Sequence, residues 1–249
     1  MTPKSGLVVL RPAVRWFVAA SLLLTVAGCA TVKTADPRDP LESFNRSMFS
    51  FNDELDKALF KPAATIYRDV TPALVRQGVS NFLGNLDDVW SFVNSLLQGK
   101  PSAAAQTFMR VNVNTIFGLG GIFDIASEMR LDRQREDFSQ TLGVWGFQPG
   151  PYIVLPVFGP STLRDLVAWP VDIKGDLVSQ IADIPVRNTL KLLDQLDLRA
   201  SYLSLGTAVE EGALDKYAFT RDAFLQRRRN AVYDGNPPDE PVDGGVKAP

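Results

Sequence analysis

The sequence predicts an all-α fold, and three observations support this prediction. Apolar residues recur at spacings of three and four over several long stretches, which is the pattern of amphipathic helices. The alternation of apolar and polar residues that is typical of half-buried strands is not found. Residues 138–163 contain no charged residue but eight glycines and prolines, so this stretch predicts an irregular, non-helical loop.

The expected helices follow one another from Leu41 to Val232. They cover residues 41–59, 73–98, 102–116, 124–129, a segment that begins at the N-cap Ser161 and is interrupted at Trp169-Pro170, residues 185–204 and residues 207–232. The helix over 73–98 is apolar around more than half of its circumference, with Asn81, Asn85 and Asn94 in between. This composition favours close helix contact or a partly wet wall over a water-facing surface.

The first 28 residues resemble a bacterial lipoprotein signal. Basic residues precede an apolar run over residues 16–26, and Val26-Ala27-Gly28-Cys29 is a small-residue cleavage site that ends in cysteine. The pattern predicts cleavage before Cys29 and lipidation of Cys29, since the apolar run is shorter than the ~20 residues of a permanent span. Ala30 stands where an Asp would resemble the inner-membrane retention signal, so sorting to the outer membrane is favoured.

The sequence therefore divides into four regions. We expect a signal peptide over residues 1–28, a lipid-anchored linker over 29–40, one helical domain over 41–233 and a disordered tail over 234–249.

The composition excludes several classes of function. The chain has 26 basic and 28 acidic residues, and loss of the basic leader makes it more acidic, which argues against nucleic-acid binding. It has no histidine, and its only cysteine is Cys29. Ser-His-Asp hydrolysis, Cys-His chemistry and His-ligated zinc are thus excluded. We expect no catalytic residue, no metal site and no cofactor.

A second uncharged stretch, residues 111–123, contains the turn Gly118-Leu119-Gly120-Gly121. A phosphate-binding loop would need a following Lys-Ser or Lys-Thr, which is missing here. We interpret Gly118, Gly120 and Gly121 as a packing turn, where backbone segments approach closely or a helix turns tightly.

The uncharged stretch 138–163 is long enough to cross a bilayer, but its glycines and prolines exclude a spanning helix. Two interpretations stay open: a buried proline-rich loop of a soluble enzyme, or a channel wall or gate that contacts lipid. The candidate channel or lipid-contacting residues are Val144, Trp145, Phe147, Tyr152, Ile153, Val154 and Phe158.

Several blocks of the sequence resemble, in the same order, the MlaA/VacJ family of outer-membrane lipoproteins. The resemblance covers roughly residues 36–230. Its blocks are residues 39–46 (DPLESFNR), 79–86, 94–99, 112–124, 137–143 (DFSQTLG), 150–156 (GPYIVLP) and 159–165 (GPSTLRD).

The resemblance implies a fold and a function. The fold would be a ring-like bundle of amphipathic helices embedded in the inner leaflet of the outer membrane, with the irregular Gly/Pro-rich loop lining a central channel. The protein would remove mislocalised phospholipids from the outer leaflet and pass them to a periplasmic lipid-carrier protein, beside a trimeric porin and without breaking a bond. It would lie on the periplasmic side of the outer membrane, anchored by lipid.

Two alternatives come from other classes of protein. One is a structural scaffold of the envelope that is tethered by Cys29 and transports nothing. The other is a periplasmic hydrolase that uses carboxylates, for which Glu42, Asp124, Asp137 and Asp165 are candidates. Surface salt bridges and helix caps are a simpler explanation for these four residues.

Overall fold

The computed structural model describes residues 36–239, and within this range it describes the side chains of all residues but 207–211. The fold is mostly helical. Its elements are α2 (Glu42–Leu55), which continues through a π-helical turn (Asp56–Phe60) into α3 (Lys61–Val70), then α4 (Ala73–Leu97), α5 (Pro101–Ile116), α6 (Ile125–Glu128), α7 (Phe138–Val144), β1 (Tyr152–Leu155), β2 (Gly159–Thr162), α8 (Leu163–Gly175), a 3-10 turn (Val178–Gln180), α9 (Ile184–Ser201), α10 (Leu203–Gly212) and α11 (Lys216–Val232).

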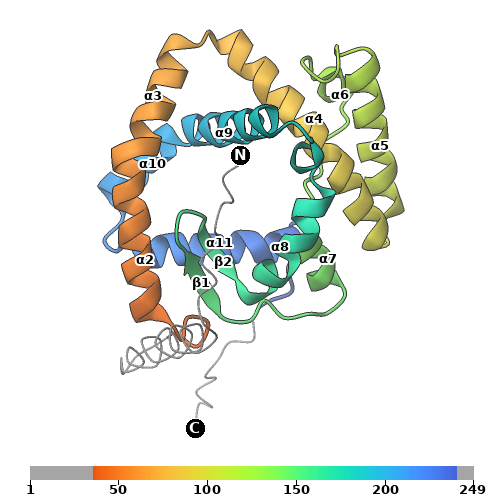
Figure 1. Ribbon diagram of the computed structural model, residues 1–249. Helices are drawn as coiled ribbons and strands as arrows, with labels where there is room; N and C mark the ends of the chain where they lie inside the picture. The colour runs from red at the N-terminus through yellow and green to blue at the C-terminus, as the bar shows by residue number, and fades with distance from the viewer. Residues whose placement is uncertain (1–35, 240–249) are drawn as a thin grey trace, which may run out of the picture.

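The helices succeed one another around the centre of the molecule (Figure 1). The continuous helix of α2 and α3 forms one side, and α4 with α5 packed against it forms another. Helix α9 contacts both α3 and α4, while α11 and the hairpin of β1 and β2 lie on the opposite side of the centre. This arrangement places α8, α9, α11 and the hairpin around the same central region.

Residues 138–163 are more regular than the sequence predicts. Residues 138–144 form α7, because Asp137 and Gln140 make a capping box: the Gln140 amide donates to Asp137 Oδ1 (2.8 Å) and the Asp137 amide to Gln140 Oε1 (3.1 Å). Residues 152–162 form an antiparallel hairpin with Tyr152 opposite Thr162 and Leu155 opposite Gly159. The prediction of a non-helical loop is thus wrong for α7, and the all-α prediction misses one short hairpin.

Three predicted boundaries are also wrong. The N-cap of α8 is Thr162 and not Ser161, because Thr162 and Asp165 form a second capping box. Pro170 lies inside α8, so no interruption occurs at Trp169-Pro170. The last break between helices lies between α10 and α11 at residues 213–215, and not before residue 207.

The interior of this fold is unusually polar. Among the described residues, 20 buried side chains are polar or charged and 12 are apolar. Helix α4 shows the pattern best, since its buried positions include all three asparagines that the sequence analysis singled out. Leu74, Val75, Leu96 and Leu97 of the same helix are exposed. A water-soluble protein normally has the opposite distribution.

An apolar core cluster joins the hairpin to α11. Tyr152 and Val154 of β1 and Tyr217 of α11 are buried there, with Met48, Phe49, Phe224 and Leu225 packed around them. Because successive side chains of a strand point to opposite faces, Tyr152 and Val154 lie inside while Ile153 is half-buried.

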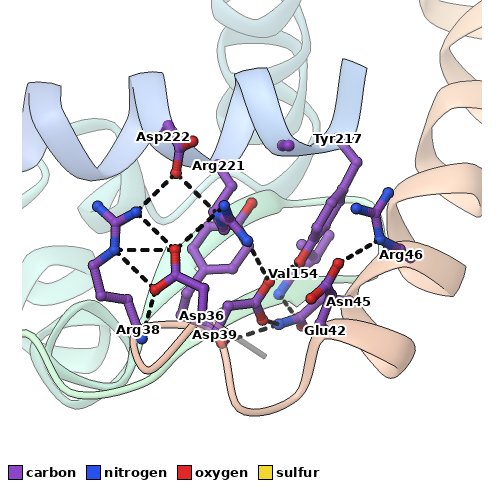
Figure 2. A network of polar contacts seen from close by, with 12 residues as sticks. Asp36, Arg38, Asp39, Glu42, Asn45, Arg46, Val154, Tyr217, Arg221 and Asp222 are labelled. Atoms are coloured by element: carbon purple, nitrogen blue, oxygen red, sulfur yellow. Dashed lines mark hydrogen bonds and ion pairs between the residues drawn. The ribbon is translucent and has the colours of Figure 1, made fainter. Parts of the chain in front are cut away.

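A polar network lies beside this core cluster (Figure 2). Asp39 is fully buried, and its carboxylate accepts hydrogen bonds from Asn45 Nδ2 (2.7 Å), the Tyr217 hydroxyl and Arg221 NH1 (3.3 Å). Asn45 also donates to the Tyr152 carbonyl and accepts from the Val154 amide. The network therefore ties the chain before α2 to α2, β1 and α11, so residues 36–40 belong to the folded structure and not to a linker.

A central cavity with an apolar wall and a charged wall

A cavity of about 680 Å³ lies among the hairpin, α8, α9 and α11. Its apolar lining comes from Phe60, Leu155, Val157, Phe158, Pro160, Leu166, Trp169 and Phe224. Its polar lining comes from Asp137, Ser139, Ser161, Asp165, Asp172, Asp176, Lys191, Asp194, Gln195, Arg227 and Arg228. We call the first set the apolar wall and the second the charged wall; the names describe the kind of side chain, since α8 and α11 contribute to both sets.

The hairpin and α8 supply most of the apolar wall. The turn between β1 and β2 carries Val157 and Phe158, and the Phe158 ring meets Trp169 edge to face with ring centroids 4.7 Å apart. Both rings keep part of their surface exposed, which leaves apolar surface available to a ligand.

Arg228 is the central cation of the charged wall. Its guanidinium donates to both carboxylate oxygens of Asp137 (2.6 and 3.0 Å) and to Asp165 Oδ1 (2.7 Å). Burial alone would lower the pKa of Arg228, but these two carboxylates outweigh it and raise that pKa. Asp137 caps α7, and Asp165 belongs to the capping box of α8. One arginine of α11 therefore binds the capping carboxylates at the N-termini of both helices.

The remaining carboxylates of the charged wall have weaker partners. Asp172 accepts hydrogen bonds from the Trp90 indole (2.8 Å) and the Phe138 amide (2.8 Å), both neutral donors. Asp176 lies 3.6 Å from the Lys191 ammonium. Burial raises the pKa of Asp194, and the nearby Asp197 and Asp176 raise it further. Within residues 36–239, Asp194 has no hydrogen-bonding or ion-pairing side-chain partner.

Of the residues predicted to face a channel, the cavity lining contains Phe158 alone. Tyr152 and Val154 are buried core residues, because strand alternation turns them inward, and Val154 also lines a second pocket beside α2. Val144, Trp145 and Phe147 are exposed, and the Trp145 indole donates to the Leu97 carbonyl (3.0 Å). Ile153 is half-buried. Cys29, the predicted lipidation site, lies outside the described residues.

The three glycines of the predicted packing turn differ from one another. A Cβ on Gly118 would lie 2.2 Å from the Phe123 carbonyl oxygen, and one on Gly121 would lie 2.6 Å from Asn85 Cβ. Nothing lies within 4 Å of a Cβ on Gly120, so close packing is the wrong explanation for this residue. Its φ of +74° is the feature that favours glycine.

The four carboxylates proposed for a hydrolase all have structural partners. Glu42 pairs with Arg46 (2.8 Å), and Asp124 caps α6 and pairs with Arg110 (3.0 Å). Asp137 and Asp165 cap helices and bind Arg228. Salt bridges and helix caps therefore account for these residues, although Asp165 is half-buried and not at the surface.

Sequence reasoning missed most of the charged wall. One signal was present in α9, where Lys191, Asp194 and Gln195 are spaced by three and four residues and so share a helix face. No local pattern predicts that Arg228 meets Asp137 and Asp165, because these residues are far apart in the sequence.

In the described part of the chain, no group of three or more Asp, Glu, Cys or His side chains is placed to hold a metal ion. None of the helices described here combines the length and the apolar character that crossing a membrane requires.

The fold and the cavity define a mostly helical protein that offers a ligand both apolar and charged side chains. The chain belongs to the MlaA lipoprotein family, whose sequence model matches residues 37–231, and the resemblance to MlaA/VacJ proteins is thereby confirmed. It is 35% identical over 229 residues to the intermembrane phospholipid transport system lipoprotein MlaA of Haemophilus influenzae, which covers 88% of this chain and 91% of that protein.

Two further relatives agree with this assignment. The protein of the same name from Escherichia coli K12 is 36% identical over 208 residues, which is 81% of this chain and 82% of that protein. A solved structure described as "Structural basis for maintenance of bacterial outer membrane lipid asymmetry" matches with a TM-score of 0.70 at 34% identity, over 80% of this chain and 99% of that chain.

Proposed function

We propose that this chain is an outer-membrane lipoprotein that removes mislocalised phospholipids from the outer leaflet and passes them to a periplasmic carrier protein. The two-walled cavity carries this proposal. A phospholipid must present its acyl chains to apolar side chains while its head group stays near polar ones, and the cavity offers both. The Haemophilus influenzae and Escherichia coli relatives are named for intermembrane phospholipid transport.

The outer surface supports a position in the membrane. Large apolar side chains are exposed on α5 and on the turn that follows it: Phe108, Met109, Ile116, Phe117, Leu119, Ile122 and Phe123. An exposed apolar patch of this kind is typical of a membrane or protein contact. We place the helices as a ring-like bundle within the inner leaflet of the outer membrane, with the central cavity as the channel and the hairpin in its wall.

The remaining parts of the proposal rest on the sequence and the family. Lipid on Cys29 would anchor the protein on the periplasmic side, in keeping with the lipoprotein family to which the chain belongs. A trimeric porin would lie beside it in the membrane. Transport breaks no bond, so the proposal needs no catalytic residue, and the structural roles of Asp124, Asp137 and Asp165 agree with this.

The test uses a deletion strain that carries the wild-type chain, Phe158→Asp or Leu214→Asp. Phe158 lines the cavity with 68% of its surface exposed, so an Asp there puts a charge on the apolar wall at little cost to packing. Leu214 lies fully exposed between α10 and α11, outside the cavity lining, and provides a matched control. We expect outer-leaflet phospholipid, measured with a surface-reactive probe, to stay high with Phe158→Asp and to return to the normal level with Leu214→Asp.

Other outcomes would contradict the proposal at different points. Normal clearance by Phe158→Asp at normal abundance would exclude the cavity as the path. If deletion of the gene left surface phospholipid unchanged, the chain would be a scaffold and not a transporter. Release of fatty acid or a free head group by the purified protein would indicate a hydrolase.

A further inference from the structure

This inference rests on the proposed function and concerns the head group that the cavity selects. The charged wall has five carboxylates and three cationic side chains, and most of them neutralise one another. Arg228 is held by Asp137 and Asp165, and Lys191 lies beside Asp176 while its ammonium donates to Ser179 Oγ (2.6 Å). These contacts remove both cations from the set available to a ligand.

Three charged groups are left after this internal pairing. Asp172 has only neutral hydrogen-bond donors, and Asp194 has no side-chain partner in the described structure. Arg227 is exposed, and within residues 36–239 it likewise makes no hydrogen bond or ion pair. The wall therefore offers a ligand one guanidinium and two carboxylates.

Negative charge near Asp194 extends beyond the lining. Asp87 of α4 has an exposed side chain, and desolvation by the neighbouring protein together with the negative charges of Asp194 and Asp176 raises its pKa. Arg135 opposes this effect on both Asp87 and Asp194. The pKa values of Asp87 and Asp194 are thus affected more strongly by neighbouring carboxylates than by Arg135.

We propose that the cavity prefers a zwitterionic phospholipid with a primary ammonium, such as phosphatidylethanolamine, over an anionic one such as phosphatidylglycerol. The ammonium is attracted to the carboxylates of Asp194 and Asp172, the phosphate binds Arg227, and the acyl chains lie against Leu166, Trp169 and Phe158. The phosphate of an anionic phospholipid can also pair with Arg227. Such a lipid has no cation for the two carboxylates, and they repel its net negative charge. The discrimination between the two head groups therefore comes from Asp172 and Asp194, while Arg227 binds the phosphate of either lipid.

The experiment measures which lipids the full-length protein binds. The lipoprotein is reconstituted in vesicles of equal phosphatidylethanolamine and phosphatidylglycerol content, extracted in a mild detergent, and its bound lipids are counted by mass spectrometry. We expect the wild type to be enriched in phosphatidylethanolamine by roughly two- to fivefold, the range of one partly exposed ion pair. Asp194→Asn should lower this enrichment, since only Asp172 then remains, and Asp194→Lys should reverse it.

Two further variants separate selectivity from binding. Asp132→Asn makes the same charge change at an exposed residue outside the cavity lining and should keep the wild-type ratio. Arg227→Gln should lower the total bound phospholipid without favouring phosphatidylglycerol. Melting temperatures of all variants identify any that fail to fold.

The outcomes distinguish the inference from the function on which it rests. Bound lipid with the same composition as the vesicle, or an unchanged ratio in a folded Asp194→Lys variant, would overturn the head-group preference and leave phospholipid transport standing. A folded wild-type protein that binds no phospholipid at all would overturn both.

Discussion

Asp39 depends for its stability on side chains at the other end of the chain. Its carboxylate is fully buried and is satisfied by Asn45, Tyr217 and Arg221. Removing the carboxylate leaves the buried Tyr217 hydroxyl without an acceptor and takes one of three carboxylates from Arg221, which keeps Asp36 and Asp222. Burial and the neighbouring Asp39 raise the pKa of Tyr217, which keeps the hydroxyl protonated as a donor.

Asp39→Ala is therefore expected to lower the free energy of unfolding by about 2 kcal/mol, because the buried Tyr217 hydroxyl loses its acceptor. Asp222→Ala, which removes an exposed partner of Arg38 and Arg221 in the same network, should cost less than about 1 kcal/mol. Urea unfolding of both variants in one detergent would provide the comparison. Equal costs would mean that burial of Asp39 contributes nothing beyond a surface ion pair.

The glycine turn predicts a ranking of three alanine variants. Gly118→Ala and Gly121→Ala should each cost ~1–3 kcal/mol or more, because a Cβ would overlap Phe123 backbone or Asn85. Gly120→Ala should cost about 1 kcal/mol, from its positive φ alone. Melting temperatures would test the ranking, and a Gly120 variant as unstable as the Gly118 variant would contradict it.

Asp124 should make the protein sensitive to acid. Burial opposes ionisation of Asp124, but hydrogen bonds from Ser127, Asn114 and Arg110 outweigh it and lower its pKa to about 2. Because this value lies below the ordinary pKa of 3.8, the ionised carboxylate stabilises the fold above about pH 4, and that stabilisation is lost as the pH falls toward 2. Asp124→Asn should cost ~2 kcal/mol at pH 7 and less at pH 3. A cost that does not change with pH would show that the charge is unimportant.

The helices were easier to predict than the hairpin, for a physical reason. Residues 73–97 carry a long periodic pattern, and the observed α4 ends within one residue of the prediction. The strand Gly159–Thr162 has no apolar alternation of its own and exists because Val154 pairs with Pro160 and Ile153 with Ser161. The capping box of α7 was visible in Asp137 and Gln140, but the glycines and prolines that follow it concealed this signal.

The buried face of α4 shows a second limit of sequence analysis. The periodic apolar stripe of this helix suggests a core-facing side, yet the buried residues are mainly polar ones such as Asn81, Asn85 and Asp88. Asn81 donates to the Ile122 carbonyl and Asn85 to Thr115 Oγ1, so their partners lie on α5 and on the glycine turn. Burial of polar side chains depends on such distant partners, which periodicity does not reveal.

Helix α2 holds the turn of the hairpin through one side chain. Asn52 Nδ2 donates to the Leu155 carbonyl (2.8 Å), and Asn52 Oδ1 accepts from the Val157 amide (2.7 Å). Asn52→Ala should raise hydrogen exchange of the Val157 amide about fivefold or more, since each lost hydrogen bond is worth ~1 kcal/mol. Ser47→Ala, which removes a hydroxyl bonded within α2, is the control and should leave this amide unchanged. Equal exchange in both variants would mean that packing alone holds the turn.

The described part of the chain buries more polar than apolar side chains and exposes many large apolar ones, and this distribution predicts how the protein behaves without its lipid. A Cys29→Ala chain should still associate in part with membranes, because α5 exposes Phe108, Met109 and Ile116. Adding Ile116→Asp should move more of it to the soluble fraction, at a cost of ~2.5–3.5 kcal/mol for a charge at full membrane depth and less near the interface. Cell fractionation measures both steps, with Leu214→Asp as the control.

Two results would contradict this expectation. Complete release of the Cys29→Ala chain would mean that lipid alone holds the protein at the membrane. An identical distribution of the Ile116→Asp and Leu214→Asp chains would place the membrane contact away from α5.

The contacts of Asp39 also determine when folding can finish. Tyr217 follows Asp39 by 178 positions and Arg221 by 182, so two of its three partners are synthesised long after it. Until then, Asn45, six positions after Asp39, is the one of these three partners that has already been synthesised. Contacts between such distant residues require a large loss of chain entropy before they form. We therefore expect the joint between α2 and α11 to form late in folding, after α11 has been synthesised.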